Sequence, residues 1–166
     1  MREIQAPNEW KRKEDEPVIF LAGSIEMGSA VQWQKAVVSM LSKKEVLLLN
    51  PRRNDWDPSW VQSITNPQFK QQVVWELRGL ENCDTVFMYF DPDTKSPITL
   101  LEFGLHFNKT VVCCPPGFWR RGNIEVVCDR YKVPLYDDLY KAITHIEEDL
   151  EDTNSGGLPS ANSPIQ

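Results

Sequence analysis

The sequence is poor in the residues that build metal centres, disulfide frameworks and membrane spans. Its 166 residues include four cysteines and two histidines, and the cysteines form no CxxC pair and show no regular spacing. No apolar run approaches the ~20 residues that cross a bilayer, and residues 1–17 lack the apolar stretch of a secretory signal. We therefore expect reduced thiols, no metal or other cofactor, no membrane contact and a cytoplasmic location.

An excess of positive charge is absent too. The chain has 18 basic and 24 acidic residues, a net charge of -6, and the run at 147–152 supplies five of the negative charges. The rest of the chain is therefore nearly neutral. Non-specific binding to nucleic acids needs a basic face that neutralises phosphates, so we expect no nucleic-acid polymer among the partners.

The composition, with 41% hydrophobic and 25% charged residues, is typical of one soluble globular domain. Residues 1–16 are polar and carry both signs of charge, which predicts a mobile N-terminal segment. Residues 153–166 carry no charge and are rich in Ser, Asn, Gly and Pro, which predicts a disordered tail. The domain is expected at residues 17–152.

Within this domain, short apolar runs alternate with longer segments of helical period. The runs predict buried strands at 18–21, 46–49, 85–90 and 110–113. The longer segments predict helices at 29–42, 68–81, 96–107, 124–131 and 137–151. Strands that are apolar on both faces, each followed by a helix, indicate a parallel sheet covered on both sides. We expect a three-layer α/β sandwich with a sheet of four or five strands.

Two of these helices carry more detailed predictions. In the helix at 68–81, the apolar spacing predicts that Val73, Val74, Leu77 and Leu80 face inward. In the helix at 96–107, Ser96 followed by a proline has the chemistry of an N-cap.

Ligands of such sheets bind beyond the carboxyl ends of the strands, so the loops after the strands are the places to look. The first loop contains Gly23, Ser24, Ile25 and Gly28, and its glycines let the backbone approach a ligand closely. It has neither the full pattern of a phosphate-binding P-loop nor that of a dinucleotide site. A plain tight turn between strand and helix stays an equal alternative.

Glu102 is the most informative acidic residue. It lies in the second turn of the helix at 96–107, and its immediate neighbours are Leu101 and Phe103. A buried carboxylate is costly unless it is hydrogen-bonded or used in chemistry. If the helix packs on the sheet, Glu102 points toward the strand ends, where the helix N-terminus helps to keep it ionised. The alternative is a solvent-facing glutamate on an amphipathic helix.

Further polar residues stand close to strand ends. Asp84 precedes the third predicted strand, where an ordinary turn residue is the alternative. The loop after the second predicted strand is crowded with polar residues beside two tryptophans, which suits a planar or anionic ligand, or equally a surface ion network. These residues are Asn50, Arg52, Arg53 and Asp55.

Five ordered blocks of sequence resemble the nucleoside 2-deoxyribosyltransferase-like family, across about residues 17–135. The blocks are FLAGSI at 20–25, NPRRNDW at 50–56, WEL at 75–77, SPITLLEFG at 96–104 and WRRGNIE at 119–125. The loop at 23–25 also looks like that of the 2'-deoxynucleoside 5'-phosphate N-hydrolases. The resemblance implies a flavodoxin-like fold, which is a three-layer sandwich around a parallel sheet.

The resemblance also implies roles for single residues. Glu102 matches the family's nucleophilic glutamate, and Asp84 matches the active-site aspartate before the third strand. Ser96 stands where transferases often carry an aspartate and where the nucleotide hydrolases carry a phosphate-binding serine, so transfer and hydrolysis both stay open. Members are dimers or larger assemblies in which a neighbouring subunit commonly completes the pocket, and Asn123 is a candidate for that purpose.

The expected function is therefore cleavage of the N-glycosidic bond of a nucleoside or nucleotide. A glutamate stabilises the oxocarbenium-like state and traps it as a ribosyl-enzyme. The leaving base then needs a proton, from Asp84 or from Asp91 or Asp93. A free nucleobase as acceptor gives transfer and water gives hydrolysis. A non-catalytic nucleotide-binding module is the competing class.

The expected binding residues combine the glycine loop, the polar loop after the second strand and the start of the third helix. Adjacent cations in the polar loop predict a preference for a 5'-phosphorylated ligand. The set consists of Gly23, Ser24, Ile25, Asn50, Arg52, Arg53, Asp55, Ser96 and Asn123.

Overall fold

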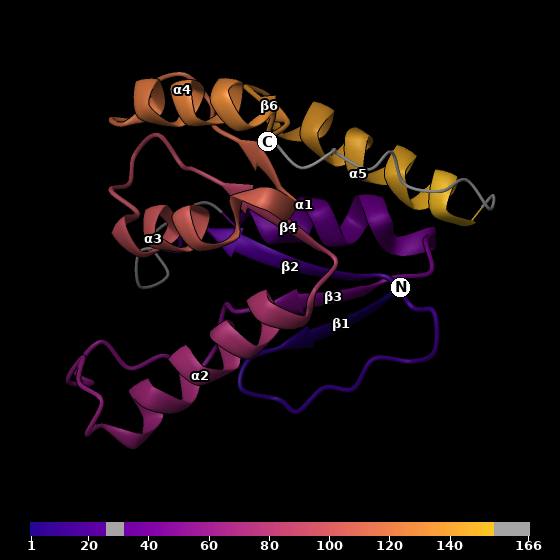
Figure 1. Cartoon of the computed structure of the whole chain (residues 1–166). Coiled ribbons are helices and arrows are strands. Elements are labelled where there is room, and N and C mark those ends of the chain that lie inside the picture. Colours follow the sequence, from indigo (N-terminus) through magenta and orange to yellow (C-terminus); the bar gives the residue numbers. More distant parts are fainter. Residues whose placement is uncertain (26–31, 155–166) are drawn as a thin grey trace, which may run out of the picture.

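Six parallel strands form a single sheet in the computed structural model, which describes residues 1–25 and 32–154 (Figure 1). Their order across the sheet is β1 (Arg2–Gln5), β3 (Leu47–Asn50), β2 (Val18–Gly23), β4 (Thr85–Tyr89), β5 (Thr110–Cys113) and β6 (Leu135–Tyr136). Apolar residues of β2 to β5 are buried on both faces of the sheet, as parallel strands between two helix layers require. The predicted three-layer α/β sandwich is confirmed.

The sheet has more strands than the four or five predicted. β1 lies within the segment expected to be mobile, yet all four of its residues pair with β3, from Arg2 opposite Leu47 to Gln5 opposite Asn50. The guanidinium of Arg2 also binds the carboxylate of Glu16 at 2.5 Å. The residues of this edge strand are mostly polar and give no strand pattern in the sequence, so the strand is recognised only from its pairing with β3. β6 has two residues, which is too short for a periodic signal.

The helices divide cleanly between the two faces. α2 (Pro67–Asn82), α3 (Pro97–His106) and α4 (Arg121–Tyr131) cover one face, where Phe20, Leu49 and Met88 lie in the core. α1 (Trp33–Met40) and α5 (Leu139–Asn154) cover the other face (Figure 1). The short 3-10 helices η2 (Leu41–Lys43) and η3 (Phe107–Lys109) follow α1 and α3. No described helix is long and apolar enough to cross a membrane.

α2 buries a different face from the one predicted. Leu80 is buried as expected, but Val74 and Leu77 are 52% and 40% exposed. The buried positions are instead Gln72, Trp75, Gly79 and Leu80. The ring of Trp75 lies 6.2 Å from that of Phe20, and burying this large aromatic surface decides the rotation of the helix.

Two predicted elements reach into parts of the chain that the structure does not describe. Of the helix predicted at 29–42, α1 and η2 are described, whereas residues 26–31, including Gly28, lie outside the described ranges. Of the tail predicted at 153–166, residues 155–166 also lie outside them. α5 runs on to Asn154, past the predicted domain boundary.

The strand order places one switch point beside β2. β3 pairs with one edge of β2 and β4 pairs with the other, so the loops after β3 and β4 leave on opposite sides of the strand. In open α/β sheets, a crevice forms where the strand order reverses, beyond the carboxyl ends of the strands. The loops after β2, β3 and β4 therefore meet around one opening.

Gly79 tests the packing of α2 on the sheet. A Cβ atom added there would lie 2.6 Å from Cδ2 of Phe20, so Gly79→Ala is expected to lower the free energy of unfolding by about 1–3 kcal/mol. Gly104→Ala is the matched control, since nothing lies within 4 Å of its added Cβ, and it should raise stability by about 0.5–1 kcal/mol. Urea unfolding measures both, and equal effects would contradict the close contact.

Candidate active site

A cavity of about 700 Å³ opens at the switch point. Its wall combines the end of β2, the loop after β3, one side of α2 and the first turns of α3. Most of this wall is apolar, including Trp56, Phe69 and Leu77. Ligand sites are commonly apolar clefts with a few convergent polar groups, and the polar groups here come from α2, α3 and the loop after β3.

Two of these polar groups are carboxyls, Glu102 on α3 and Glu76 on α2. Burial raises the pKa of Glu102 to about 8, and the neighbouring charge of Glu76 contributes to the rise. Burial also raises the pKa of Glu76 to about 7, against the opposing effect of a hydrogen bond from Gln72. Near neutral pH this pair therefore keeps protons that exposed glutamates would have lost.

The expectation that the helix N-terminus keeps Glu102 ionised is wrong. Glu102 lies in the second turn of α3, and the effect of a helix dipole declines within the first turn. Loss of hydration and the like charge of Glu76 outweigh it, so the protonated form of Glu102 is favoured at neutral pH. The solvent-facing alternative does not fit either, because the side chain lines the cavity.

Gln72 holds Glu76 in place from one turn earlier in α2. Its Nε2 donates to Oε1 of Glu76 and to the carbonyl oxygen of Pro51, both at 2.8 Å. The side chain is 4% exposed and belongs to the cavity wall. One amide thus connects the carboxyl on α2 to the loop after β3.

The first residues of the glycine loop bring backbone close to the cavity. Gly23 has φ of +146°, and an added Cβ would lie 2.4 Å from the carbonyl oxygen of Tyr89, so only glycine fits where β2 ends against β4. Gly23 and Ile25 line the cavity. Ser24 does not, because it lies buried underneath, where its backbone N–H donates to Tyr89.

Ser24 ties the glycine loop to the start of α3. Its Oγ lies 2.6 Å from Oγ of Ser96 and 2.9 Å from Oγ1 of Thr94, and the two latter oxygens are 2.8 Å apart. Ser96 has a left-handed backbone with φ of +46° and makes no side-chain cap. Ser96 stands at the predicted N-cap position with a proline at the first helical position, but its hydroxyl bonds to this buried cluster and does not cap the helix. Ser96 itself reaches the cavity wall.

Asp84 lies at the amino-terminal end of the strands, opposite to the cavity. It precedes β4, where its Oδ2 accepts from the backbone N–H of Val18 at 2.8 Å and binds Arg12 at 2.8 Å. The cavity lies beyond the other end of β4, and five residues of strand span about 16 Å. The structure therefore does not bring Asp84 to Glu102, and the expectation that they share a pocket is corrected.

The two alternative aspartates do not form part of the cavity wall. Asp91 is 3% exposed, and its Oδ1 accepts a hydrogen bond of 3.0 Å from the backbone N–H of Asp93. This is the geometry of a side chain that stabilises a turn. The loop after β4 thus shapes the approach to α3.

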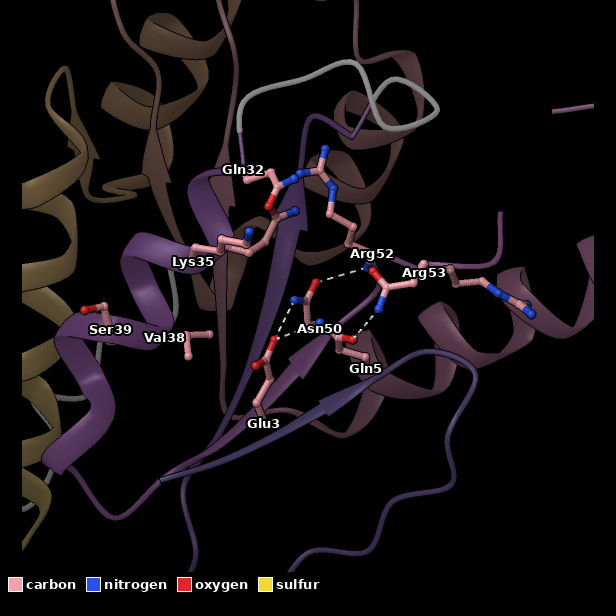
Figure 2. A pocket seen from close by; sticks show the side chains of 11 residues that line it. Glu3, Gln5, Gln32, Lys35, Val38, Ser39, Asn50, Arg52 and Arg53 are labelled. Atoms are coloured by element: carbon pink, nitrogen blue, oxygen red, sulfur yellow. Dashed lines mark hydrogen bonds between the residues drawn. The ribbon is translucent and has the colours of Figure 1, made fainter. Parts of the chain in front are cut away.

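The polar loop after β3 separates its two arginines. Arg53 binds Asp55 through two hydrogen bonds of 2.8 and 2.9 Å and stacks over Trp60 at 5.0 Å. Its side chain extends away from that of Arg52 (Figure 2). Arg53 lines the cavity with a charge that Asp55 already balances, whereas Asp55 itself is exposed and outside the wall. Burial lowers the pKa of Arg52, which also lines the cavity.

Asn50 faces a different, smaller pocket of about 440 Å³ between α1 and the β1–β3 edge (Figure 2). Its Nδ2 donates to Oε1 of Glu3 at 2.7 Å, and its Oδ1 accepts from the backbone N–H of Arg52 at 3.0 Å. Asn50 therefore orients the loop that carries Arg52 and does not line the larger cavity. Asn123 is also outside that cavity, exposed in the first turn of α4.

Glu76 and Gln72 line the cavity but are not among the site residues predicted from the sequence. A signal for Glu76 was present, since it stands at helical spacing between Val73 and Leu80 on a stripe that is otherwise apolar. Gln72 carried no comparable signal, because its role depends on the loop after β3. Within the described ranges, no three His, Cys, Asp or Glu side chains gather as metal ligands do.

The raised pKa values predict a dependence of stability on pH. The folded protein holds the Glu102 proton up to about pH 8, whereas an unfolded glutamate loses it near 4.5, so this carboxyl stabilises the fold at low pH and the contribution is lost as pH rises between these values. Glu102→Gln should match the wild type at pH 5 and exceed it by about 1–3 kcal/mol at pH 9. Urea unfolding across this range measures it, and parallel curves would argue against a buried carboxyl.

Comparison with known proteins agrees with the resemblance read from the sequence. The family model described as nucleoside 2-deoxyribosyltransferase like matches residues 16–118, a range that contains β2 to β5 and both glutamates. No curated protein was found to match the chain. The family supports a glycosyl-transfer or N-glycosidase function. Since the match covers well over half of the 166 residues, the chain belongs to the nucleoside 2-deoxyribosyltransferase-like family.

Proposed function

We propose that the protein cleaves the N-glycosidic bond of (deoxy)nucleosides or nucleotides through Glu102 and transfers the sugar to a second base. The observation that carries this proposal is the pair of carboxyls, Glu76 and Glu102, within one cavity at the switch point of the sheet. Two carboxyls that face one sugar can divide nucleophilic attack and proton transfer between them. Family membership supports the same class of chemistry.

In the first step, an oxygen of Glu102 bonds to the anomeric carbon as the bond from that carbon to the base nitrogen breaks. The electron pair of the broken bond goes to the base, and positive charge develops on the sugar in between. A carboxylate beneath the sugar stabilises this charge and then holds the sugar covalently. An acceptor base reverses the sequence and releases Glu102.

The proton that the leaving base needs is transferred between Glu102 and Glu76. Near neutral pH, Glu76 ionises before Glu102, because Gln72 donates to Glu76 and opposes the effect of its burial. Glu76 can then take the proton of Glu102 as Glu102 attacks, and pass it to the nitrogen of the leaving base. No other donor is required, and the acceptor base returns the proton in the second half.

The cavity wall offers partners for both the base and the phosphate of a nucleotide. Trp56, Phe69 and Leu77 provide flat apolar surface for a base. Arg52 on the cavity wall provides a cation for a 5'-phosphate. The guanidinium of Arg53 binds Asp55. Asp84 has no part in this proposal.

Hydrolysis is the second candidate, and it differs only in the acceptor. Water instead of a base attacks the ribosyl-enzyme, so exclusion of water decides the product. Incubation with a panel of nucleosides and 5'-monophosphates, with and without a free base, separates the candidates. Base exchange indicates a transferase, release of free base alone indicates a hydrolase, and binding without reaction indicates a non-catalytic module.

The expected homodimer or larger assembly stays a prediction. Ile98, Leu101 and Leu105 form a stripe on α3 that is 58–61% exposed at the cavity, and a second copy that covered it would also exclude water. Because Asn123 is outside the cavity of its own chain, a role in substrate binding requires that second copy.

Substitution of the glutamates tests the proposed mechanism. Glu102→Ala is expected to abolish cleavage and keep the fold, because it removes the nucleophile. Glu76→Gln should lower kcat by about 10²–10⁴-fold, since it removes the proton carrier. Glu81→Gln, on the exposed side of the same helix as Glu76, is the control and should retain turnover. Full activity in Glu102→Ala would remove the mechanism.

The neighbouring arginines test recognition of a phosphate. Arg52→Met should lower kcat/KM for a nucleoside 5'-monophosphate by about 10–100-fold relative to the nucleoside, through loss of a charge-assisted hydrogen bond. Arg53→Met is the matched control, because Asp55 and Trp60 already occupy its guanidinium, and it should leave the ratio of the two substrates unchanged. Equal affinity of the wild type for both ligands would count against phosphate recognition.

A further inference from the structure

The amide of Gln72 has a fixed orientation. The carbonyl oxygen of Pro51 can only accept a hydrogen bond, so the amide atom 2.8 Å from it must be the NH₂ group. The same nitrogen lies 2.8 Å from Oε1 of Glu76. The opposite atom, Oε1 of Gln72, is buried and has no hydrogen-bond partner among the described residues.

This orientation distinguishes the two oxygens of Glu76. Oε1 must accept from Gln72 whether the carboxyl is charged or neutral, because an NH₂ group only donates. Because the carbonyl oxygen of a neutral carboxyl accepts better than its hydroxyl oxygen, a proton that arrives at Glu76 is favoured at Oε2. One hydrogen bond thus selects the atom at which Glu76 takes up and releases the proton.

We propose that Gln72 is a positioning residue, which keeps Glu76 ready to accept the proton of Glu102 at Oε2. The inference rests on the proposed function, since it gives Gln72 a part in the proton transfer described above. Pro51 anchors the amide, so the loop after β3 sets the geometry of the pair.

The electrostatic surroundings agree with this role. Among the described residues, the charged groups of the cavity wall are Glu102 from α3, Arg52 and Arg53 from the loop after β3, and Glu76 itself. Burial raises the pKa of Glu76, and the hydrogen bond from Gln72 opposes that rise. Without the donor, Glu76 would stay protonated to higher pH and would be unable to accept a proton in the neutral range.

The test is the pH profile of kcat/KM for Gln72→Met, which keeps the length of the side chain and removes the donor. Glu76 must be ionised to accept a proton, so activity rises as pH increases through its pKa, and loss of the donor should move this acidic limb to higher pH. We expect the loss at pH 6 to exceed the loss at pH 9 by about tenfold, which corresponds to one pKa unit. Gln68→Met, on the exposed side of α2, should keep the wild-type profile.

The outcomes separate this inference from the proposed function. If the wild type cleaves nucleosides and Gln72→Met loses activity equally at every pH, Gln72 has only a packing role and the inference fails alone. If the wild type cleaves none of the panel, both fail. Gln72→Asn, whose shorter side chain cannot span both acceptors, should show the same shift and decides the matter if Gln72→Met does not fold.

Discussion

Burial of two like carboxyls in one cavity is the constraint on which the site depends. Glu76 and Glu102 come from different helices, and each loses hydration when α2 and α3 pack on the sheet. Two ionised carboxylates at such a place repel each other, so the pair retains protons near neutral pH. The proposed chemistry uses this property, because a carboxyl that is easily protonated and deprotonated near neutral pH can move a proton.

The buried sheet supplies stability that offsets the free-energy cost of burying Glu76 and Glu102. β2, β3 and β4 are buried on both faces, and their carboxyl ends converge where the strand order reverses. The end of β2 is tied to the start of α3, since Gly23 lies against Tyr89 and the hydroxyls of Ser24, Thr94 and Ser96 bond to one another. The carboxyls therefore stand on elements that a ligand cannot easily displace.

Three loops divide the tasks around the cavity. The first residues after β2 bring backbone close to the cavity, and the loop after β4 determines where α3 begins. The loop after β3 carries Arg52 and the carbonyl of Pro51. Asn50 turns the last of these loops by accepting the N–H of Arg52. Asn50, which does not line the larger cavity, thus orients the loop that places Arg52 in the cavity wall.

The sequence by itself determined the layers, because runs such as 46–49 are apolar throughout and only a sheet covered on both sides buries them. It also determined that Glu102 stands among apolar neighbours, and its resemblance to a family indicated the chemistry. Only the tertiary structure decided that Glu76 and Gln72 join Glu102 and that Asp84 does not. The reason is that spacing along a chain gives the face of a helix or the end of a strand, whereas contact across the cavity depends on how helices rotate on the sheet. Trp75 decided that rotation for α2. The register of β2 with β4 left Asp84 at the amino-terminal end of the strands, away from the cavity.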